Sequence, residues 1–173
     1  MTIKILQLRY GCRTIAAVAV LLTACLWTAS AAQAQTISSD GKHTLLTVPV
    51  EGGLDAIFFY DDVTRVLKGS VPNAEGAFSI VYKPLSIDKL FAGPGGKTIK
   101  DPRFLFAVGR VSIRTRGRLQ FGSGMIYITE TKTGRMVALA LPWSKSWRTS
   151  SKSITLEPKL FKKFRLRNVD MDE

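Results

Sequence analysis

The chain has 173 residues, of which 46% are hydrophobic and 22% charged, and its formal net charge is +12. This apolar fraction is enough to build a hydrophobic core and excludes an intrinsically disordered chain. The 14 glycines and 7 prolines are close to ordinary usage, which excludes collagen-like and low-complexity sequences. The length predicts one domain or, at most, two small ones.

The N-terminal segment has the pattern of an export signal. Its first 13 residues contain three basic residues and no acidic residue, an apolar run follows from Ile15 to Leu26, and Ala32-Gln33-Ala34 supplies a small-x-small cleavage site. We therefore predict a signal peptide over residues 1–34 and a secreted or periplasmic protein. A retained membrane anchor is an alternative, because the apolar run with its flanking alanines approaches the ~20 residues that a spanning helix needs.

A second alternative is a lipoprotein. Leu22-Thr23-Ala24-Cys25 resembles a bacterial lipobox, in which Cys25 is acylated and tethers the protein to a membrane. The residues after Cys25 continue the apolar run, unlike a typical lipoprotein tether, and this favours soluble export. The other cysteine, Cys12, also lies in the predicted signal. The processed protein therefore has neither a disulfide nor a cysteine-ligated metal.

The basic charge persists after processing. Removal of residues 1–34 takes away three of the 25 basic residues and none of the 13 acidic residues, which leaves a net charge of +9. Because the protein is predicted to be exported, we expect no nucleic acid as a partner. The expected partners are acidic polysaccharide, lipid headgroups or an acidic protein.

Short β-branched and aromatic runs between turn residues predict an all-β fold, a mainly antiparallel sandwich or meander of about 8 strands. One short helix is expected over residues 86–91, with Ser86 as its N-cap. We divide the processed chain into a flexible segment (35–43), a β domain (44–157) and a basic amphipathic tail (158–173). The predicted strands are Thr44–Val50, Leu54–Tyr60, Val66–Val71, Phe78–Tyr82, Phe104–Ile113, Gly124–Thr131, Met136–Leu141 and Ser153–Leu156.

One hairpin pattern occurs twice, in Ile57–Pro72 and in Ile126–Pro142. Both copies read as an apolar strand, an acidic residue, a turn containing Thr and Arg, a second apolar strand and a proline that ends the strand. Because a hairpin alone is marginally stable, the two copies are expected either to face each other across a sandwich or to lie side by side in one sheet. Chance similarity between two ordinary hairpins is the alternative.

The segments Leu54–Asp61 and Gly124–Trp143 resemble the β-hairpins of an uncharacterised group of exported bacterial proteins with repeated hairpins. Their rhythm is also similar to that of β-propeller blades. The resemblance implies hairpins and export, and it brings no catalytic residue with it. A closed propeller needs at least four four-stranded blades, which is more than this chain can supply.

Residues suited to catalysis are few. The single histidine, His43, lies in a polar stretch and is expected to be a solvated loop residue. One histidine without a processed cysteine cannot supply the usual zinc ligands, so we predict neither a metal nor a cofactor. Asp61 and Glu130 are candidates for a carboxylate-based glycan hydrolase, but their positions are typical of turn residues that bind backbone N–H groups.

The main candidate site is a row of arginines on the strand predicted to begin at Phe104. In an extended strand, alternate side chains share a face, so this row would present guanidinium groups on one face and apolar residues on the other. Guanidinium is suited to carboxylate, sulfate and phosphate groups. The alternative is a solvated edge strand whose charges deter aggregation. The arginines are Arg110, Arg114, Arg116 and Arg118.

The C-terminal stretch supplies a second candidate surface, in which basic residues alternate with leucines and phenylalanines. It is compatible with a helix or a strand, and it is suited either to a membrane or acidic partner or to docking on the domain through its phenylalanines. Trp143 and Trp147 are compatible with stacking on sugars, although core or loop anchoring is favoured. The basic residues are Lys162, Lys163, Arg165 and Arg167.

These patterns together predict an exported, non-enzymatic binding module that contacts an acidic ligand through a basic β face. One alternative is a structural subunit of an envelope assembly, a homo-oligomer paired through strand edges. A carboxylate-based glycan hydrolase is the least favoured hypothesis.

Overall fold

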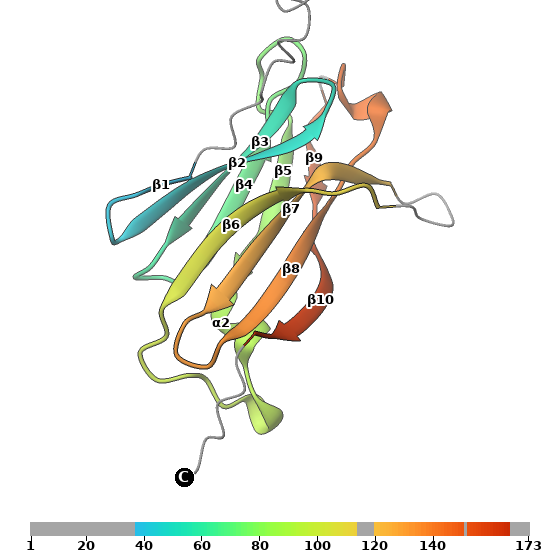
Figure 1. Ribbon diagram of the computed structural model, residues 1–173. Coiled ribbons are helices and arrows are strands. Elements are labelled where there is room, and N and C mark those ends of the chain that lie inside the picture. Colours follow the sequence, from blue (N-terminus) through green and yellow to red (C-terminus); the bar gives the residue numbers. More distant parts are fainter. Residues whose placement is uncertain (1–36, 114–119, 151, 167–173) are drawn as a thin grey trace, which may run out of the picture. The chain divides into compact units, whose positions relative to one another are not determined.

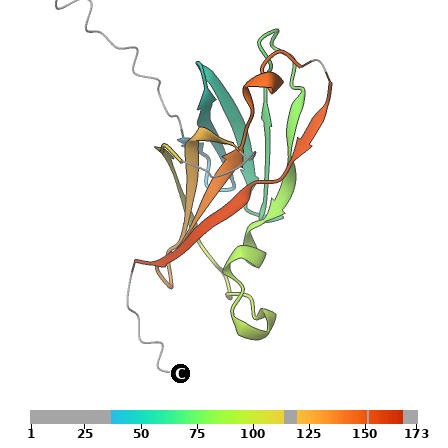
Figure 2. The same cartoon turned by 90° about the vertical axis from the view of Figure 1, so that its right-hand side faces the viewer.

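The computed structural model describes residues 37–113, 120–150 and 152–166. Within them the chain forms two sheets, one of six strands and one of four, in which all but one of the strand pairs are antiparallel (Figure 1). Viewed edge-on, the sheets form two layers, and the C-terminal strands run from one layer to the other (Figure 2). The predicted all-β fold, a mainly antiparallel sandwich, is confirmed.

The six-stranded sheet has the order β1-β2-β3-β4-β5-β9. Its first five strands follow one another along the chain as an antiparallel meander, and β9 joins at the far edge parallel to β5. The strands are β1 (Ile37–Ser39), β2 (His43–Glu51), β3 (Leu54–Asp61), β4 (Val66–Val71), β5 (Ile80–Ser86) and β9 (Ile154–Leu156).

The four-stranded sheet has the order β10-β8-β7-β6 and is wholly antiparallel. Its strands are β6 (Phe104–Arg110), β7 (Phe121–Glu130), β8 (Arg135–Pro142) and β10 (Lys159–Arg165). The short helix α2 (Ile87–Phe91) and the 3-10 turn η1 (Pro94–Gly96) lie on the connection from one sheet to the other, and a second 3-10 turn, η2 (Lys145–Trp147), follows β8.

The core lies between the two sheets. Side chains such as Leu46 and Phe58 from one sheet and Ile126 and Leu139 from the other are at most 1% exposed and belong to one cluster. The sheets approach most closely where β2 crosses β7. A Cβ at Gly124 would overlap the backbone oxygen of Pro49, so this crossing requires glycine. Burial of large apolar side chains is the main stabilising contribution to a domain that lacks disulfides.

The core cluster lies within residues Gln35–Glu173, which form a compact unit by themselves. Because this unit contains its own hydrophobic core, we expect it to fold without the preceding residues. The predicted signal peptide, including Cys12 and Cys25, lies outside the described residues. None of the helices in the described part of the chain has the length and apolar composition that crossing a membrane requires.

All eight predicted strands are present, with end points that differ by a few residues. The predicted helix is α2. Ser86 occupies its N-cap position, although the Ser86 side chain makes no capping hydrogen bond. The two similar hairpins, β3–β4 and β7–β8, belong to different sheets, which favours the sandwich arrangement over the side-by-side one.

The structure also contains two strands that the sequence analysis did not assign. β1 lies in the segment expected to be flexible, and β10 lies in the predicted tail, so β structure extends beyond residues 44–157. The C-terminal stretch is therefore a strand where a helix was the other possibility. The strand predicted over Phe104–Ile113 is shorter and ends at Arg110.

Candidate binding surface

Strand β10 presents a row of basic residues at one edge of the four-stranded sheet. Its outer side is unpaired among the described strands, and all seven of its residues are exposed. We call Lys159–Arg165 the basic strand. An edge strand rich in lysine commonly prevents edge-to-edge aggregation, and the same exposure makes its ammonium groups accessible to an anion.

The register with β8 determines which way each basic side chain points. Lys162 pairs with Ala138 and Lys163 with Val137, so these two lysines lie on opposite faces of the sheet. A bulge between Leu160 and Lys162 places the extra residue, Phe161, out of register. The Lys162 Nζ lies 5.2 Å from the centroid of the Phe164 ring, a cation–π contact that leaves the ammonium group in solvent.

Within the described residues, the positive charge of the basic strand is largely uncompensated. Lys159 Nζ lies 3.5 Å from a carboxylate oxygen of Glu157. Among the residues that the structure describes, no carboxylate lies within ion-pair distance of Lys162, Lys163 or Arg165. Arg167, the last member of the predicted C-terminal surface, lies outside the described residues. The described part of this surface therefore presents several cations on one short edge.

The predicted arginine row is only partly described. Arg110 is exposed and ends β6, where it pairs with Gly124 of β7. Val111 extends the pairing by one hydrogen bond, from its N–H to the carbonyl of Ser123. Arg114, Arg116 and Arg118 lie outside the described residues. The structure thus brings Arg110 to the end of an edge strand and says nothing of the remaining three.

A cleft of about 320 Å³ lies beside the end of β6, lined by Glu51, Ser112, Gln120 and Trp143 among others. The indole N–H of Trp143 donates to Glu51 Oε2 at 2.8 Å, and Lys145 Nζ lies 3.6 Å from the other carboxylate oxygen. Trp143 is only 3% exposed and belongs to the core cluster, so it is an anchor, as favoured from the sequence, and its ring is not available to stack on a sugar.

The two acidic residues weighed for hydrolysis are turn residues. Glu130 is fully buried, and its Oε2 accepts hydrogen bonds from the N–H and the hydroxyl of Thr133. Burial raises the pKa of Glu130, but these bonds and those from the N–H groups of Lys132 and Arg103 lower it more, so that the net pKa is below its ordinary value. A buried, ionised carboxylate with both oxygens bonded is poorly suited to protonate a glycosidic oxygen.

Asp61 has the equivalent place in the other hairpin. Its Oδ2 accepts from the hydroxyl of Thr64 at 2.8 Å and its Oδ1 from the N–H of Val63 at 2.9 Å. The hydrogen bond from the Thr64 hydroxyl is the largest of the effects that lower the pKa of Asp61. Turn geometry therefore accounts for both carboxylates.

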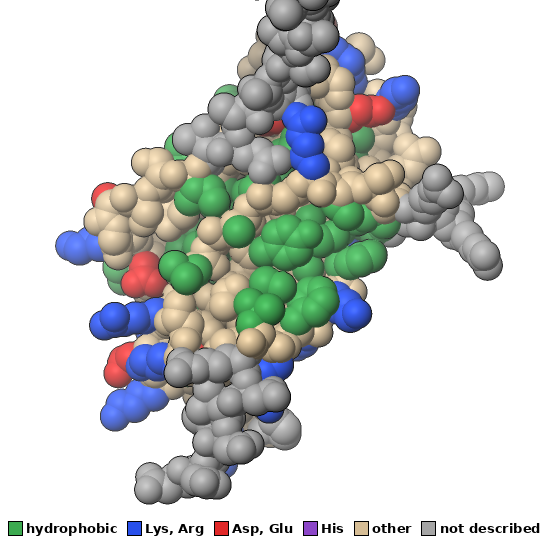
Figure 3. Space-filling model, in the orientation of Figure 1, with side chains coloured by type: hydrophobic (Ala, Val, Ile, Leu, Met, Phe, Trp, Pro, Cys, Tyr) green, Lys and Arg blue, Asp and Glu red, His purple; other side chains and the backbone are tan. Residues whose placement is uncertain are grey.

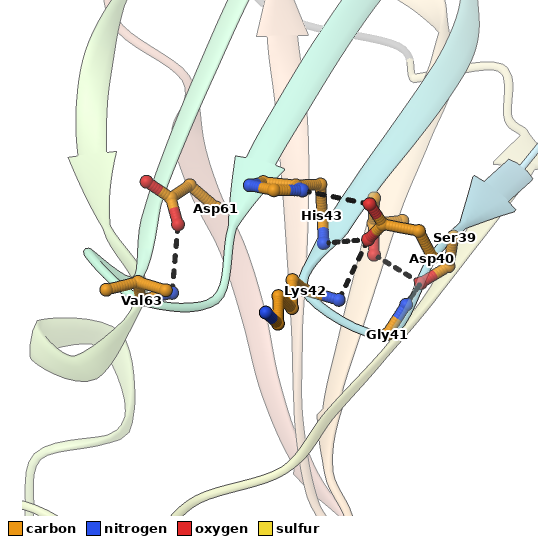
Figure 4. A network of polar contacts seen from close by, with 8 residues as sticks. Ser39, Asp40, Gly41, Lys42, His43, Asp61 and Val63 are labelled. Carbon is orange, nitrogen blue, oxygen red and sulfur yellow. Dashed lines mark hydrogen bonds and ion pairs between the residues drawn. The ribbon is translucent and has the colours of Figure 1, made fainter.

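His43 was expected to be a solvated loop residue; its side chain is 43% exposed, but it begins the strand β2 and does not lie in a loop (Figure 4). Its ring stacks on Phe59 at 5.3 Å between centroids, and its Nδ1 lies 3.1 Å from Asp40 Oδ2. The other oxygen of Asp40 accepts from the N–H groups of Lys42 and His43. The histidine thus closes the β1–β2 turn, and the bond to it is the largest of the effects that lower the pKa of Asp40.

A second cleft, of about 400 Å³, opens next to this turn. Lys42, Arg103 and Asp62 line it, and the hydroxyl of the buried Tyr60 donates to Asp62 at 3.1 Å. Burial, reinforced by the charge of Asp62, raises the pKa of Tyr60. The cleft thus contains one carboxylate beside its two cations, and a phenol kept protonated is a hydrogen-bond donor, with no tendency to act as a base.

No group of three or more His, Cys, Asp or Glu side chains suited to a metal ion occurs in the described part of the chain. Comparison of the chain with protein-family models, with curated proteins and with solved structures gave no match. Any function assigned to the protein therefore depends on the geometry and charge of this chain alone.

Proposed function

We propose that this protein is an exported, non-enzymatic binding module that holds an acidic ligand at the basic strand. The observation that carries the proposal is the unbalanced charge of β10, where Lys162, Lys163 and Arg165 are exposed and have no acidic partner among the described residues. Closely spaced cations repel one another in the free protein, and a polyanion relieves that repulsion. An acidic polysaccharide, a lipid headgroup or an acidic protein has the required charge.

The strand geometry supports this proposal in a second way. The backbone of β10 is fixed by its antiparallel pairing with β8, from Lys159–Ala140 to Arg165–Arg135. The points at which its side chains leave the backbone are therefore fixed before a ligand binds. A preset array loses less conformational entropy on binding than cations on a free tail would lose. The sulfate or carboxylate groups of an extended polymer match such a linear array.

The experiment is heparin chromatography of the segment Gln35–Glu173. Substitution of Lys162, Lys163 and Arg165 by serine together should lower the salt concentration at elution. The matched control replaces Lys68, Lys83 and Lys97, which are exposed elsewhere, and changes the net charge equally. If both triple variants elute at the same salt concentration, retention reflects net charge alone and the basic strand is not the binding surface.

A further inference from the structure

The outer face of the four-stranded sheet is apolar, and the described residues cover only part of it: Val111, Ile113 and Phe121 pack on a small cluster of side chains that are at most 2% exposed. In a two-layer sandwich the outer face of an antiparallel sheet is normally polar. Here the sheet has hydrophobic residues on both faces, and Met125, Ala138 and Ala140 form a second cluster apart from the core. Figure 3 shows hydrophobic side chains gathered over β7, β8 and β10.

The register of the strands identifies three rows that cross this face from β6 to β10. Residues paired across strands point to the same side of a sheet. We call these side chains the outer apolar face. Its rows are Leu105-Thr129-Met136-Phe164, Ala107-Tyr127-Ala138-Lys162 and Gly109-Met125-Ala140-Lys159.

The three rows contain no acidic residue, and their only charges are two lysines at the β10 end: Lys162, and Lys159, whose exposed ion pair with Glu157 lies outside the rows. Leu105, at the opposite edge, is 64% exposed, and the ring of Tyr127 lies over Gly109, where a Cβ would come within 2.8 Å of it. The outer face of the six-stranded sheet also exposes apolar side chains, but polar residues stand in register with them in the sheet interior: Lys68 pairs with Phe59, and Thr47 and Ser70 pair with Ile57. The outer face of the four-stranded sheet therefore differs in that its three rows carry charge only at one edge.

We propose that the outer apolar face docks on an anionic lipid membrane, with Leu105 and Tyr127 entering the headgroup region and Lys159 and Lys162 contacting lipid phosphates. The proposal rests on the proposed function and names its acidic ligand. Charge complementarity selects the occupant: a second copy would bring two strongly basic bodies together, whereas an anionic bilayer offers both negative charge and hydrocarbon. Acidic polysaccharide lacks the hydrocarbon, and aliphatic side chains offer it no hydrogen bonds.

Sedimentation with lipid vesicles tests this assignment on the segment Gln35–Glu173. The vesicles contain equal parts of phosphatidylglycerol and phosphatidylcholine, or phosphatidylcholine alone. We expect binding to the anionic vesicles, with partitioning weakened about tenfold by Leu105→Ser, because an exposed leucine loses its transfer to the interface. The matched control is Leu45→Ser, which makes the same change on the outer face of the other sheet, where Leu45 is 46% exposed, and it should leave partitioning unchanged.

The lysines are tested in the same assay. Lys159→Ser with Lys162→Ser should weaken partitioning about fivefold for each lysine, and Lys68→Ser with Lys83→Ser should weaken it less. Equal binding to neutral and anionic vesicles would overturn the proposal, as would equal effects of Leu105→Ser and Leu45→Ser. If the protein does not bind vesicles, and light scattering shows a dimer that Leu105→Ser dissociates, this face would be assigned to a second copy instead.

The two proposals fail in different ways. Leu105→Ser should leave elution from heparin unchanged, because the leucine carries no charge. Retention on heparin through the basic strand, without binding to vesicles, would support the proposed function and contradict docking on a membrane. Loss of selective retention on heparin, with vesicle binding that still depends on Leu105, contradicts the polyanion surface while leaving the apolar docking face in place.

Discussion

Glu130 binds Thr133 twice, since the N–H and the hydroxyl of the threonine donate to the same carboxylate oxygen at 2.8 and 2.6 Å. The equivalent pair in the other hairpin is Asp61 and Thr64, joined at 2.8 Å between carboxylate and hydroxyl. The two turns therefore contain the same hydrogen bond, from a threonine hydroxyl to a carboxylate, on two different sheets. They differ in burial, because Glu130 is fully buried and Asp61 is not.

The Glu130 turn predicts an acid-sensitive contribution to stability. Because the folded-state pKa of Glu130 is below its ordinary value of 4.5, its stabilising contribution is present above that pH and is lost as the pH falls through the folded-state pKa. Glu130→Gln should lower the free energy of unfolding by about 1–3 kcal/mol at neutral pH. A glutamine amide has only one oxygen, and its NH2 group cannot accept the hydrogen bonds that reach the second carboxylate oxygen. Urea unfolding of both proteins across the acid range provides the measurement.

Asp61→Asn is the control for that experiment, because Asp61 makes similar bonds at an exposed turn. Its effect should be smaller, since water replaces lost hydrogen bonds at the surface. An equal loss of stability in the two variants, or an unchanged acid dependence in Glu130→Gln, would contradict the importance assigned to burial.

The arginine that follows each turn threonine holds the helix α2. Arg135 Nη1 donates to the carbonyl oxygen of Phe91 at 2.7 Å, at the C-terminal end of the helix, and Arg65 pairs with Asp88 at 3.1 Å. Arg135→Met should therefore destabilise the protein by about 1–2 kcal/mol, because the carbonyl of a buried residue loses a charged donor. Thermal unfolding followed by circular dichroism measures this change.

Arg65→Met should be milder, at most about 1 kcal/mol, because its ion pair with Asp88 is partly solvated. A larger effect at Arg65 than at Arg135 would show that the ion pair, and not the bond to the Phe91 carbonyl, dominates the attachment of α2.

The close crossing of β2 over β7 predicts a strict requirement at Gly124. A Cβ there would overlap the backbone oxygen of Pro49, so Gly124→Ala must push the two sheets apart at a loss of at least about 2 kcal/mol. The control is Gly93→Ala, at a negative φ, where the nearest atom to a new Cβ is 3.8 Å away. Chemical denaturation would refute the expectation if both variants unfolded at the same midpoint.

The arginine row remains a prediction from the sequence, because Arg114, Arg116 and Arg118 lie outside the described residues. If they extend the anion surface, their joint replacement by serine should lower the salt concentration at which the protein elutes from heparin. Elution at an unchanged salt concentration would remove them from the binding surface.

The sequence predicted most strands because β-branched and aromatic runs between turn residues indicate them, as in Leu54–Asp61, where burial then alternates in the structure. It did not identify β10, and the bulge beside Phe161 is the reason: an extra residue shifts the parity of the side chains, so basic and apolar residues no longer alternate cleanly. β1 is short and polar and carries no hydrophobic pattern at all. Such strands are determined by their pairing partners, which a single sequence does not show.

The charge of the candidate surface could be predicted from the sequence, but its position in the fold could not. The basic residues of the C-terminal stretch were identified from composition, whereas their position at an open sheet edge depends on the pairing with β8. The outer apolar face had no simple signal, because the alternation in Met125–Glu130 is hidden where both faces are hydrophobic. The bond between Glu51 and Trp143 joins residues far apart in sequence, and no local pattern indicates it.

The strands β9 and β10 are separated by two residues and belong to different sheets. This short crossing means that proteolysis after Glu157 would strip β10 from the fold and leave β8 with a bare edge. The newly exposed strand, Arg135–Pro142, is hydrophobic along almost its whole length, and an unpaired apolar edge is a template for intermolecular strand addition. A C-terminally cleaved form is therefore expected to precipitate or form fibrils, so that the solubility of the protein during storage depends on this one connection remaining intact.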